Sequence, residues 1–500
     1  MVNFSLRCRK AWWGVLGTCL GLMNAPAFSA TYSTVFAFDL HLTSSGVVEG
    51  TGSNVGFLFG TTSDTSLSYG GAIFKVAKNG GAPQVIYQLK DTDGYAPQAT
   101  LLVGTDGYLY GTTQYWSRSG TSLTQGAGTI FRIAQDGSGF TTLHVFGGLS
   151  GLHPVTSAGL NPDGIYPNYA LIQDATYLYG VTQFGGLYGS GTVFRLRKSD
   201  GALDVLHHFA AIDNVSNGTN SSGEGANPSS SLLLASDGRL YGVTSGGGAN
   251  IKTTSSGVEA TGTIYSLNVD GSGFQTLYNF SALDDTAAGV NGDGVQPLGT
   301  LVEVSSGVLV GTTSDGGTPA DTTLTGFGTI FSFDVASGDL EVLHNFNNAT
   351  GATPIGKLLL ANDGRVYGTT NDGSGTSDPV TQLGVIWSIN PATADYTMVH
   401  ALTFAQGGGF SGGLIQASDG DLYGAVSYGN ACTGINANGY GAVFRYSLTT
   451  NASSSGYSSC TTFEVDDGGG GAFSPDLLWL LSALGLAPSV RRRVFGFRQP

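Results

Sequence analysis

Short apolar runs with an alternating pattern recur along the chain, and turn-forming residues separate them. The clearest run follows an Asp-Gly pair and reads "DGYLYGTT" at 106–113, "DGRLYGVT" at 237–244, "DGRVYGTT" at 363–370 and "DGDLYGAV" at 419–426. Asp-Gly supplies the positive φ angles of a tight hairpin turn, and strict alternation is the period of a β-strand. Each copy therefore predicts a β-hairpin, and the repetition predicts a repeat architecture.

Each repeat contains four predicted strands: a leading apolar run, "LYGTT", "GTIF" and "TLHxF". The glycine of the second strand marks seven repeats, at Gly60, Gly111, Gly180, Gly242, Gly311, Gly368 and Gly424. We expect this glycine to let neighbouring blades or backbones approach closely. Seven units of four antiparallel strands predict an all-β fold, namely a seven-bladed β-propeller.

The fourth strand is missing after the last repeat and present before the first. "TLHxF" follows only six of the seven "GTIF" runs, and a similar run, "TVFAF", stands at 34–38. We therefore expect the N-terminal strand to complete the seventh blade and close the ring, which removes exposed sheet edges. The alternative is a stray N-terminal strand, with "TTFEV" at 461–465 as the last strand of the ring.

Both ends of the chain read as processing signals. Basic residues, the apolar run "AWWGVLGTCLGLM" and a small-residue zone predict a secretory signal cleaved after Ala27 or Ala30, with a retained membrane anchor as the alternative. Near the other end, a glycine run precedes an apolar stretch at 477–490 and arginines at 491–493. We divide the chain into a signal peptide (1–30), a propeller (31–465), a glycine-rich linker (466–475) and a short hydrophobic helix with an arginine cluster (476–500).

Charge and cysteine content narrow the possible partners. The formal charge of −15 argues against nucleic acid, because phosphate binding needs a basic face. Glycans and cell-surface proteins stay open, and membrane contact is expected only through the C-terminal tail. Cys432 and Cys460 are the two cysteines outside the predicted signal, and in an exported protein we expect them to form a disulfide, with free thiols as the alternative.

Two repeated residue types are candidate metal ligands. The turn aspartates Asp106, Asp237, Asp363 and Asp419 offer oxygen ligands, but the copies at 56–57 and 175–178 lack the aspartate and no calcium-loop spacing follows. The histidines of "TLHxF" recur once per blade, at His144, His207, His344 and His400. We favour turn formation for the aspartates and packing or hydrogen bonding for the histidines. We expect no cofactor, with Ca²⁺ as the alternative.

The topology of a propeller predicts where a ligand site lies. The loops between the second and third strands and the links between blades share one face, here called the long-loop face; the tight turns share the opposite, short-turn face. The long-loop face gathers varied loops, aromatic residues and acids, a profile typical of a binding surface on a rigid scaffold. The candidate ligand-binding residues are Tyr115, Trp116, Phe184, Tyr188, Asp93, Asp163 (after Asn161 and Pro162) and Asp293. Alternatively, these loops only cover the rim of the propeller.

The repeated words resemble a known family. "DGxLYGTTxxGGxxxxGTIF" followed by "TLHxF" is similar to the GloVer (Gloeo/Verruco) tandem repeat of the choice-of-anchor group of exported bacterial proteins, over residues 34–444. Residues 468–493 resemble GlyGly-CTERM sorting tails, which a protease of the rhombosortase type cuts, here near Gly470 and Gly471. The resemblance implies a secreted or cell-surface propeller, held for a time in the inner membrane by its C-terminal helix.

No catalytic motif stands out, because the chain has no G-x-S-x-G, H-E-x-x-H, P-loop or C-x-x-C pattern. The favoured function is a non-catalytic binding scaffold for a glycan or a surface protein, acting through the long-loop face. The alternative is a polysaccharide hydrolase or lyase that uses acids of the same face. A third possibility is a structural component of a surface layer.

Overall fold

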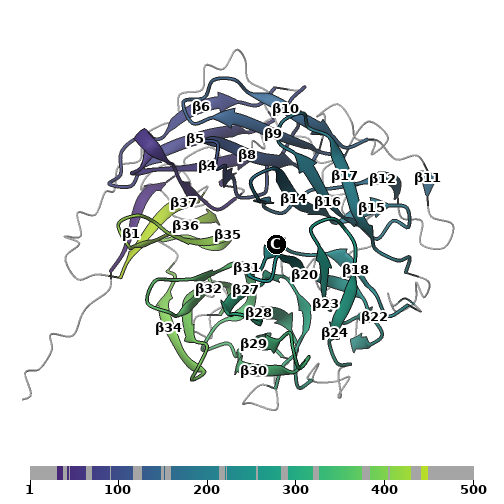
Figure 1. Cartoon of the computed structure of the whole chain (residues 1–500). Helices are drawn as coiled ribbons and strands as arrows, with labels where there is room; N and C mark the ends of the chain where they lie inside the picture. Colours follow the sequence, from purple (N-terminus) through teal and green to yellow (C-terminus); the bar gives the residue numbers. More distant parts are fainter. Residues whose placement is uncertain are drawn as a thin grey trace, which may run out of the picture.

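The computed structural model describes residues 31–448, except for 38–41, 44, 64–69, 91, 116–126, 148–150, 153–158, 213–219, 221, 255–256, 283–290, 319–325, 374–382, 404–405 and 429–440. Seven antiparallel sheets of four main strands stand around a common axis, which confirms the seven-bladed β-propeller (Figure 1). Within these residues, no helix has both the length and the apolar character needed to cross a bilayer.

The first strand of each blade lies nearest the axis and the fourth lies at the rim (Figure 1). The first strands of blades 1 to 7 are β3 (Val48–Glu49), β7 (Leu102–Val103), β13 (Ile172–Gln173), β19 (Leu233–Leu234), β27 (Val302–Ser305), β31 (Ala352–Leu360) and β35 (Gly408–Gln416). The second strands are β4 (Phe57–Ser63), β8 (Tyr108–Thr113), β14 (Tyr177–Thr182), β20 (Arg239–Gly247), β28 (Val308–Asp315), β32 (Val366–Asp372) and β36 (Leu422–Tyr428).

The outer two strands of each blade correspond to the "GTIF" and "TLHxF" words. The third strands are β5 (Ala72–Ala77), β9 (Thr129–Ala134), β16 (Thr192–Arg197), β23 (Thr263–Asn268), β29 (Thr329–Asp334), β33 (Val385–Asn390) and β37 (Ala442–Ser447). The fourth strands are β6 (Gln84–Gln88), β10 (Thr141–Val145), β17 (Leu203–His208), β24 (Gln275–Asn279), β30 (Leu340–Asn345), β34 (Asp395–Ala401) and, for blade 7, β1 (Thr31–Ala37).

Smaller elements decorate this frame. Link segments β2 (Leu42–Thr43), β18 (Gly225–Pro228) and β25 (Val295–Pro297) each pair with the second strand of a blade, and β26 (Gly299–Thr300) runs parallel to β31. A three-stranded sheet of β11 (Gly151–Leu152), β12 (Gly159–Ile165) and β15 (Phe184–Gly186) stands beside blade 3. A hairpin of β21 (Ile251–Thr254) and β22 (Gly257–Ala260) and a 3₁₀ turn, η1 (Gly52–Asn54), complete the described elements.

The N-terminal strand closes the ring. β1 pairs antiparallel with β37, the third strand of the last blade, with Thr31 opposite Ser447 and Phe36 opposite Val443 (Figure 1). The register of β1 shifts between Thr34 and Phe36, where the other fourth strands also shift. This confirms that the first strand completes blade 7. The alternative strand at 461–465 lies outside the described residues.

The core lies between the blades rather than within them. Each of seven buried clusters combines side chains from two neighbouring blades; one holds Leu109 and Ile133 of blade 2 with Phe59 and Ile73 of blade 1. Because alternate residues of a strand face opposite sides of a sheet, the "LYG" run sends its first residue to one neighbour and its second to the other. Burial of both faces explains why each blade needs two neighbours.

The marker glycine has a different partner from the one predicted from sequence. In each blade it pairs across the sheet with the aromatic residue of the third strand, as Gly180 does with Phe194. A Cβ atom on Gly180 would lie 2.5 Å from Cζ of Phe194 and 2.8 Å from Cδ2 of Leu171, both in blade 3 or its leading run. The prediction of close approach by neighbouring blades is therefore wrong: the glycine makes room for a ring of its own blade.

Candidate functional site

The acids predicted for the long-loop face sit in the links and form pairs with the rim strands. Asp93 and Asp293 are buried, at 8% and 6% exposure. Each accepts a hydrogen bond of 2.8 Å from a tyrosine hydroxyl, Tyr87 and Tyr278 respectively, and one of 2.9 Å from a backbone N–H. Their carboxylates are thus engaged inside the protein.

The same pairing recurs at the equivalent position of other blades. Nε2 of His144 lies 3.4 Å from Oδ2 of Asp163, the third predicted acid. The remaining pairs are His207 with Glu224 (3.6 Å), His344 with Thr350 (3.3 Å) and His400 with Gln406 (3.2 Å). We call these six contacts the rim pairs: in each, the third residue of a "TLHxF"-like strand meets a polar residue of the following link.

Burial lowers the pKa of three rim histidines, His207, His344 and His400. It lowers the pKa of His207 and of His344 to about 4, so both rings are neutral at pH 7. Burial also raises the pKa of the Glu224 carboxyl. His207 stacks on Phe274 and His344 stacks on Tyr396 of the following blade, with ring centroids 3.6 and 3.8 Å apart. The histidines therefore lie one per blade around the rim, and His344 and His400 form hydrogen bonds there.

The turn aspartates also have internal partners. Asp237 accepts a hydrogen bond of 2.7 Å from the hydroxyl of Tyr241 and one of 2.9 Å from the backbone of Arg239. Asp106, Asp363 and Asp419 accept the equivalent tyrosine bonds. Blade 3, which sequence inspection took to lack this aspartate, uses Asp174 one residue earlier, at 2.6 Å from the hydroxyl of Tyr179. In the part of the chain that the structure describes, no group of three His, Cys, Asp or Glu residues could hold a metal ion.

Two of the four predicted aromatic residues, Tyr115 and Phe184, both contact Tyr166 on the long-loop face, between blades 2 and 3. Tyr115 lies edge-on to Tyr166, with centroids 5.5 Å apart, and Tyr166 lies edge-on to Phe184 at 6.1 Å. Tyr95 packs on the other side of Tyr115 at 6.3 Å. We call Tyr95, Tyr115, Tyr166 and Phe184 the aromatic row. Tyr166 is buried, and the other three rings are half-buried rather than fully exposed.

Pairing of strand ends with links positions the aromatic row. Tyr115 follows β8 and forms two backbone hydrogen bonds with Tyr95, of 2.7 and 3.1 Å. One blade further on, Phe184 pairs in the same way with Ile165. Tyr166, directly before Pro167, takes a left-handed conformation with φ of +59°. Its ring contacts Tyr115 of blade 2 and Phe184 of blade 3. The contact depends on the order of the blades in the ring.

Amide side chains flank the aromatic row in both blades. Gln98 donates a 2.6 Å hydrogen bond to Gln114, and Asn168 donates one of 3.4 Å to Gln183. Gln98 is exposed, and the other three amides are half-buried. Oδ1 of Asn168 is buried and accepts no hydrogen bond from the described residues. Rings and free amide groups side by side can bind a ligand that has apolar faces and hydroxyl groups.

An exposed tip continues the aromatic row outward. Leu187 and Tyr188 follow Phe184 in the same loop and are 52% and 44% exposed. The backbone N–H of Leu187 donates a 3.3 Å hydrogen bond to Nδ1 of His208, which holds the loop against the rim strand of blade 3. Of the predicted aromatic residues that the structure describes, Tyr188 is therefore the most exposed. Trp116, both cysteines (Cys432, Cys460) and the processing positions Ala27, Ala30, Gly470 and Gly471 lie outside the described residues.

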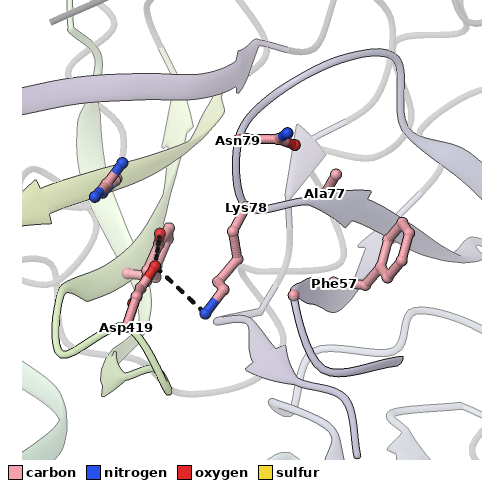
Figure 2. Close-up of a pocket in the computed structure, with 8 residues that line it drawn as sticks. Phe57, Ala77, Lys78, Asn79 and Asp419 are labelled. Atoms are coloured by element: carbon pink, nitrogen blue, oxygen red, sulfur yellow. Dashed lines mark hydrogen bonds and ion pairs between the residues drawn. The ribbon is translucent and has the colours of Figure 1, made fainter. Parts of the chain in front are cut away.

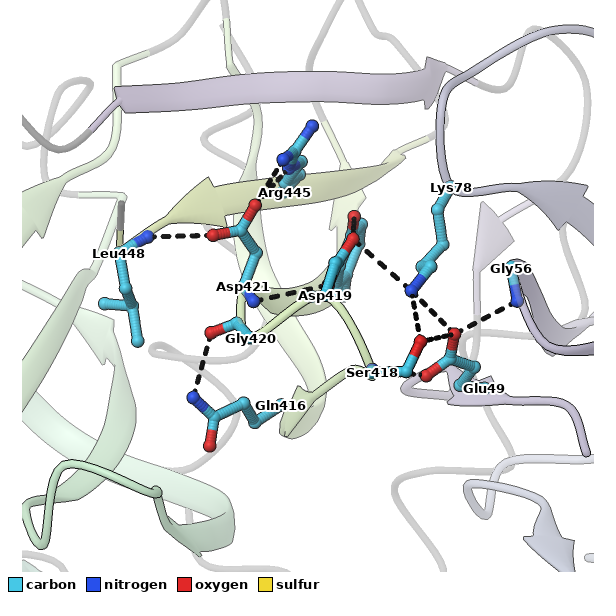
Figure 3. A network of polar contacts seen from close by, with 11 residues as sticks. Glu49, Gly56, Lys78, Gln416, Ser418, Asp419, Gly420, Asp421, Arg445 and Leu448 are labelled. Carbon is cyan, nitrogen blue, oxygen red and sulfur yellow. Dashed lines mark hydrogen bonds and ion pairs between the residues drawn. The ribbon is translucent and has the colours of Figure 1, made fainter. Parts of the chain in front are cut away.

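A cleft of about 450 Å³ lies on the other face, where blades 7 and 1 meet (Figure 2). Its lining includes Phe57 and Lys78 of blade 1 and Asp419 of blade 7. Nζ of Lys78 lies 2.6 Å from Oε1 of Glu49 and 3.3 Å from Oδ2 of Asp419, and it donates to Ser418 (Figure 3). Lys78 therefore bridges a carboxylate of blade 1 and one of blade 7 across the seam.

The seam carries one ion more than the junction of blades 4 and 5. Ser418 donates to Glu49 through its backbone N–H and its hydroxyl, at 2.6 and 2.8 Å (Figure 3). Ser236 and Glu303 make the same two contacts between blades 4 and 5. Burial alone raises the pKa of Glu49, but hydrogen bonds from Lys78, Ser418 and Gly56 outweigh it and lower that pKa. Lys78 thus reinforces the junction beside the blade that β1 closes without a covalent bond.

Sequence reasoning missed Tyr95, Tyr166 and the four amides. A comparison of the seven repeats with one another shows which blades differ at this position. The two residues after the second-strand threonine (valine in blade 7) are Gln-Tyr in blade 2 and Gln-Phe in blade 3, but Ser-Asp, Ser-Gly, Ser-Asp, Asn-Asp and Ser-Tyr in blades 1, 4, 5, 6 and 7. Glutamine followed by an aromatic residue occurs only in two adjacent blades, whereas residues required by the fold recur all around the ring.

The chain matches several solved structures at low sequence identity. A putative 6-phosphogluconolactonase from Bacteroides fragilis is 16% identical, with a TM-score of 0.44 over 78% of this chain and 88% of that one. An oligogalacturonate lyase from Vibrio parahaemolyticus is 8% identical, with a TM-score of 0.45 over 84% and 97%. The nidogen/laminin complex gives 13% identity and a TM-score of 0.32 over 63% and 81%. These similarities are too low to indicate a shared function.

Family comparison gives a firmer result. No curated protein matches the chain. The Gloeobacter/Verrucomicrobia repeat matches three times, at residues 152–323, 217–379 and 251–475, which together span 152–475 and so more than half of the chain. Copies of the "LYG", "GTIF" and "TLHxF" strands lie within the matched residues. The chain therefore belongs to the Gloeobacter/Verrucomicrobia repeat family.

Proposed function

We propose that this propeller binds glycans through the aromatic row on blades 2 and 3, as an exported or cell-surface protein without a catalytic role. The observation that carries the proposal is the coincidence of two features. Aromatic rings and amides meet at one place on the long-loop face, and that place is where two adjacent blades depart from the repeat. Residues that break a repeat in one sector cannot be explained by the fold that every sector shares.

The chemistry of the row suits a sugar. Pyranose rings have apolar C–H faces, which pack on aromatic rings, and hydroxyl edges, which hydrogen-bond to amides. The acids of this face do not favour the alternative of a hydrolase or lyase. Asp93 and Asp293 are buried and hydrogen-bonded to tyrosines, and Asp163 contacts His144. The proposal is therefore for retention of a glycan without cleavage.

We also propose that the protein is exported and that a sorting protease cuts its C-terminal tail. Both rest on the sequence of the two ends. A propeller carried to the cell surface would present its long-loop face to extracellular polysaccharides. Detection of the mature protein at the surface, with its termini determined by mass spectrometry, tests this part separately from glycan binding.

Affinity electrophoresis through gels that contain soluble polysaccharides tests the binding function. We expect retardation of the wild type on at least one polysaccharide, and an affinity roughly tenfold lower for Tyr115→Ala and for Phe184→Ala. The expected change is about 1.4 kcal/mol, which is typical of a buried aromatic contact with a ligand. A reducing-sugar assay on the same samples should show no release of sugar.

Tyr108→Ala is the matched control. Tyr108 is a half-buried tyrosine of the same blade, at the opposite end of β8 on the short-turn face. We expect it to keep full retention, and Tyr115→Phe, which keeps the ring, to behave like the wild type. Equal loss in Tyr108→Ala and Tyr115→Ala, with unchanged melting temperatures, would contradict the assignment of the site to the long-loop face.

A further inference from the structure

Blades 2 and 3 present the same binding groups twice, and this repetition indicates the kind of glycan. We infer that the aromatic row forms two successive half-sites for a linear, uncharged polysaccharide chain, one half-site on each blade. The inference rests on the proposed function and deepens it, because it specifies the length and the charge of the ligand. Three observations carry it: equivalent geometry, continuity between the half-sites, and charge.

The two half-sites are built on the same backbone register. In blade 2, Tyr115 pairs with Tyr95, and the backbone N–H of Gln114 donates to Ala96 at 3.0 Å. In blade 3, Phe184 pairs with Ile165, and the backbone N–H of Gln183 donates to Tyr166 at 3.2 Å. The amide pairs Gln98–Gln114 and Asn168–Gln183 occupy matching positions. Each blade thus offers one ring and one amide pair in the same arrangement.

Tyr166 makes the two half-sites continuous. It contacts Tyr115 of blade 2 and Phe184 of blade 3, with centroid steps of 5.5 and 6.1 Å. The row from Tyr95 to Phe184 contains four rings and is therefore longer than a single sugar ring. A ligand that touches both half-sites at once must be a chain of sugars, and joining two weak contacts in one chain raises the overall affinity.

The surroundings of the row favour an uncharged chain. The contacts that join the four rings to one another and the amides within each pair involve no lysine or arginine. Asp93 and Asp163 stand in the two links that carry Tyr95 and Tyr166, and the whole protein has a formal charge of −15. Negative charge close to the row would repel uronic acid or sulfate groups.

Polar groups in the second half-site have unused bonding capacity. Oδ1 of Asn168 is buried and receives no hydrogen bond from the described part of the chain. A buried carbonyl oxygen without a partner is costly, and a sugar hydroxyl can satisfy it once the contact between Asn168 and Gln183 opens. The amide-to-amide contact of Asn168 and Gln183 is long, at 3.4 Å, so it can yield to a ligand at little cost.

Isothermal titration of the full chain with oligosaccharides of defined length tests the inference. The panel holds β-glucan, xylan, mannan and galactan oligomers of one to six units, with oligogalacturonate as the charged series. For the neutral series that binds best, we expect affinity to rise at least roughly tenfold from one unit to four and then to level off, because both half-sites are filled. Oligogalacturonate of equal length should bind at least roughly tenfold more weakly, because of like-charge repulsion.

Single-ring variants assign the length dependence to the two blades. Tyr115→Ala and Phe184→Ala should each reduce the gain between one and four units to less than about threefold, because one half-site remains. Tyr108→Ala, on the short-turn face, should keep the full gain. Circular dichroism and melting temperature show whether each variant is folded.

Each other outcome contradicts a definite part of the account. If neutral oligomers bind with an affinity independent of length, the two half-sites are wrong while glycan binding stands. If oligogalacturonate binds more tightly than the neutral series, the assignment of an uncharged ligand is wrong. If no oligosaccharide and no polysaccharide binds, the proposed function itself fails.

Discussion

At the scale of single residues, one position of the rim strand shows how packing selects between side chains. The third residue of "TLHxF" is tyrosine, histidine or phenylalanine. In blades 1 to 7, in order, it is Tyr87, His144, His207, Tyr278, His344, His400 and Phe36. Where it is tyrosine or histidine, it contacts a polar residue of the next link; Phe36 keeps only a planar ring. The position requires a flat ring for stacking and tolerates a polar edge when the link supplies a partner.

The pKa of His344 predicts an acid sensitivity. His344 stacks on Tyr396 and lies 3.3 Å from Oγ1 of Thr350, and burial lowers its pKa from 6.5 to about 4. The unfolded chain binds a proton below pH 6.5, whereas the folded protein does so only near pH 4. The free energy of unfolding therefore falls as the pH decreases from 6.5 to 4, by on the order of 1–3 kcal/mol for this group.

His344→Phe should remove this contribution, because blade 7 shows that phenylalanine fits the same position. Urea unfolding at pH 7 and pH 4 measures the difference. We expect the wild type to lose more stability than His344→Phe over this range. An identical loss in both proteins would show that the imidazole takes up its proton as easily in the folded state as in the unfolded state.

At the scale of the element, the hairpin between the first and second strands depends on a pair rather than on a turn sequence alone. Blades 2, 3, 4, 6 and 7 have both the aspartate and the tyrosine, joined by a hydrogen bond of 2.6 to 2.8 Å. Blades 1 and 5 lack both, with Phe59 and Val310 at the tyrosine position. The two residues occur together or not at all within one chain, as expected of direct partners.

A double-mutant cycle on Asp237 and Tyr241 measures the strength of that pair. Burial, followed by the bond to Asp237, raises the pKa of the Tyr241 hydroxyl to about 12, so it stays a donor at neutral pH. We expect Asp237→Ala and Tyr241→Phe to destabilise the protein non-additively, with a coupling of about 1–2 kcal/mol for a hydrogen bond to a charged group. Additive effects in chemical denaturation would show that each residue acts alone.

The sequence contains the fold almost completely but the site only in part. Strand order, blade number and closure by β1 follow from counting copies of Gly60 and its equivalents, because every unit repeats the same information. Contacts between units do not repeat in that way. The pairing of Asp93 with Tyr87, and the position of Tyr166 between Tyr115 and Phe184, depend on how a link crosses from one blade to the next.

Two errors have the same physical origin. The partner of Gly180 is the ring of Phe194 in its own blade, because strand register places the two residues opposite each other. Asp93 and Asp293 are buried and hydrogen-bonded to tyrosines, whereas their sequence context favours an exposed loop position. Register and burial are set by tertiary packing, which local patterns constrain only weakly.

At the scale of the whole molecule, the function that we propose depends on a closed ring. The aromatic row needs blade 2 beside blade 3 in a fixed orientation, and each blade needs a neighbour on both sides to bury its faces. At the seam, β1 supplies the last strand of blade 7, and Lys78 links Glu49 of blade 1 to Asp419 of blade 7 (Figure 3). The pairing of β1 with β37 thus closes the ring without a covalent bond.

Hydrogen–deuterium exchange of the native protein tests this closure most directly. Amides of residues 31–37 lie in β1, whose pairing with β37 matches that of the other rim strands with their third strands. We predict that they exchange as slowly as those of β17 and β30, at 203–208 and 340–345, because hydrogen bonding to a neighbouring strand protects them. Exchange of residues 31–37 at the rate of an unstructured chain, with β17 and β30 still protected, would contradict the ring.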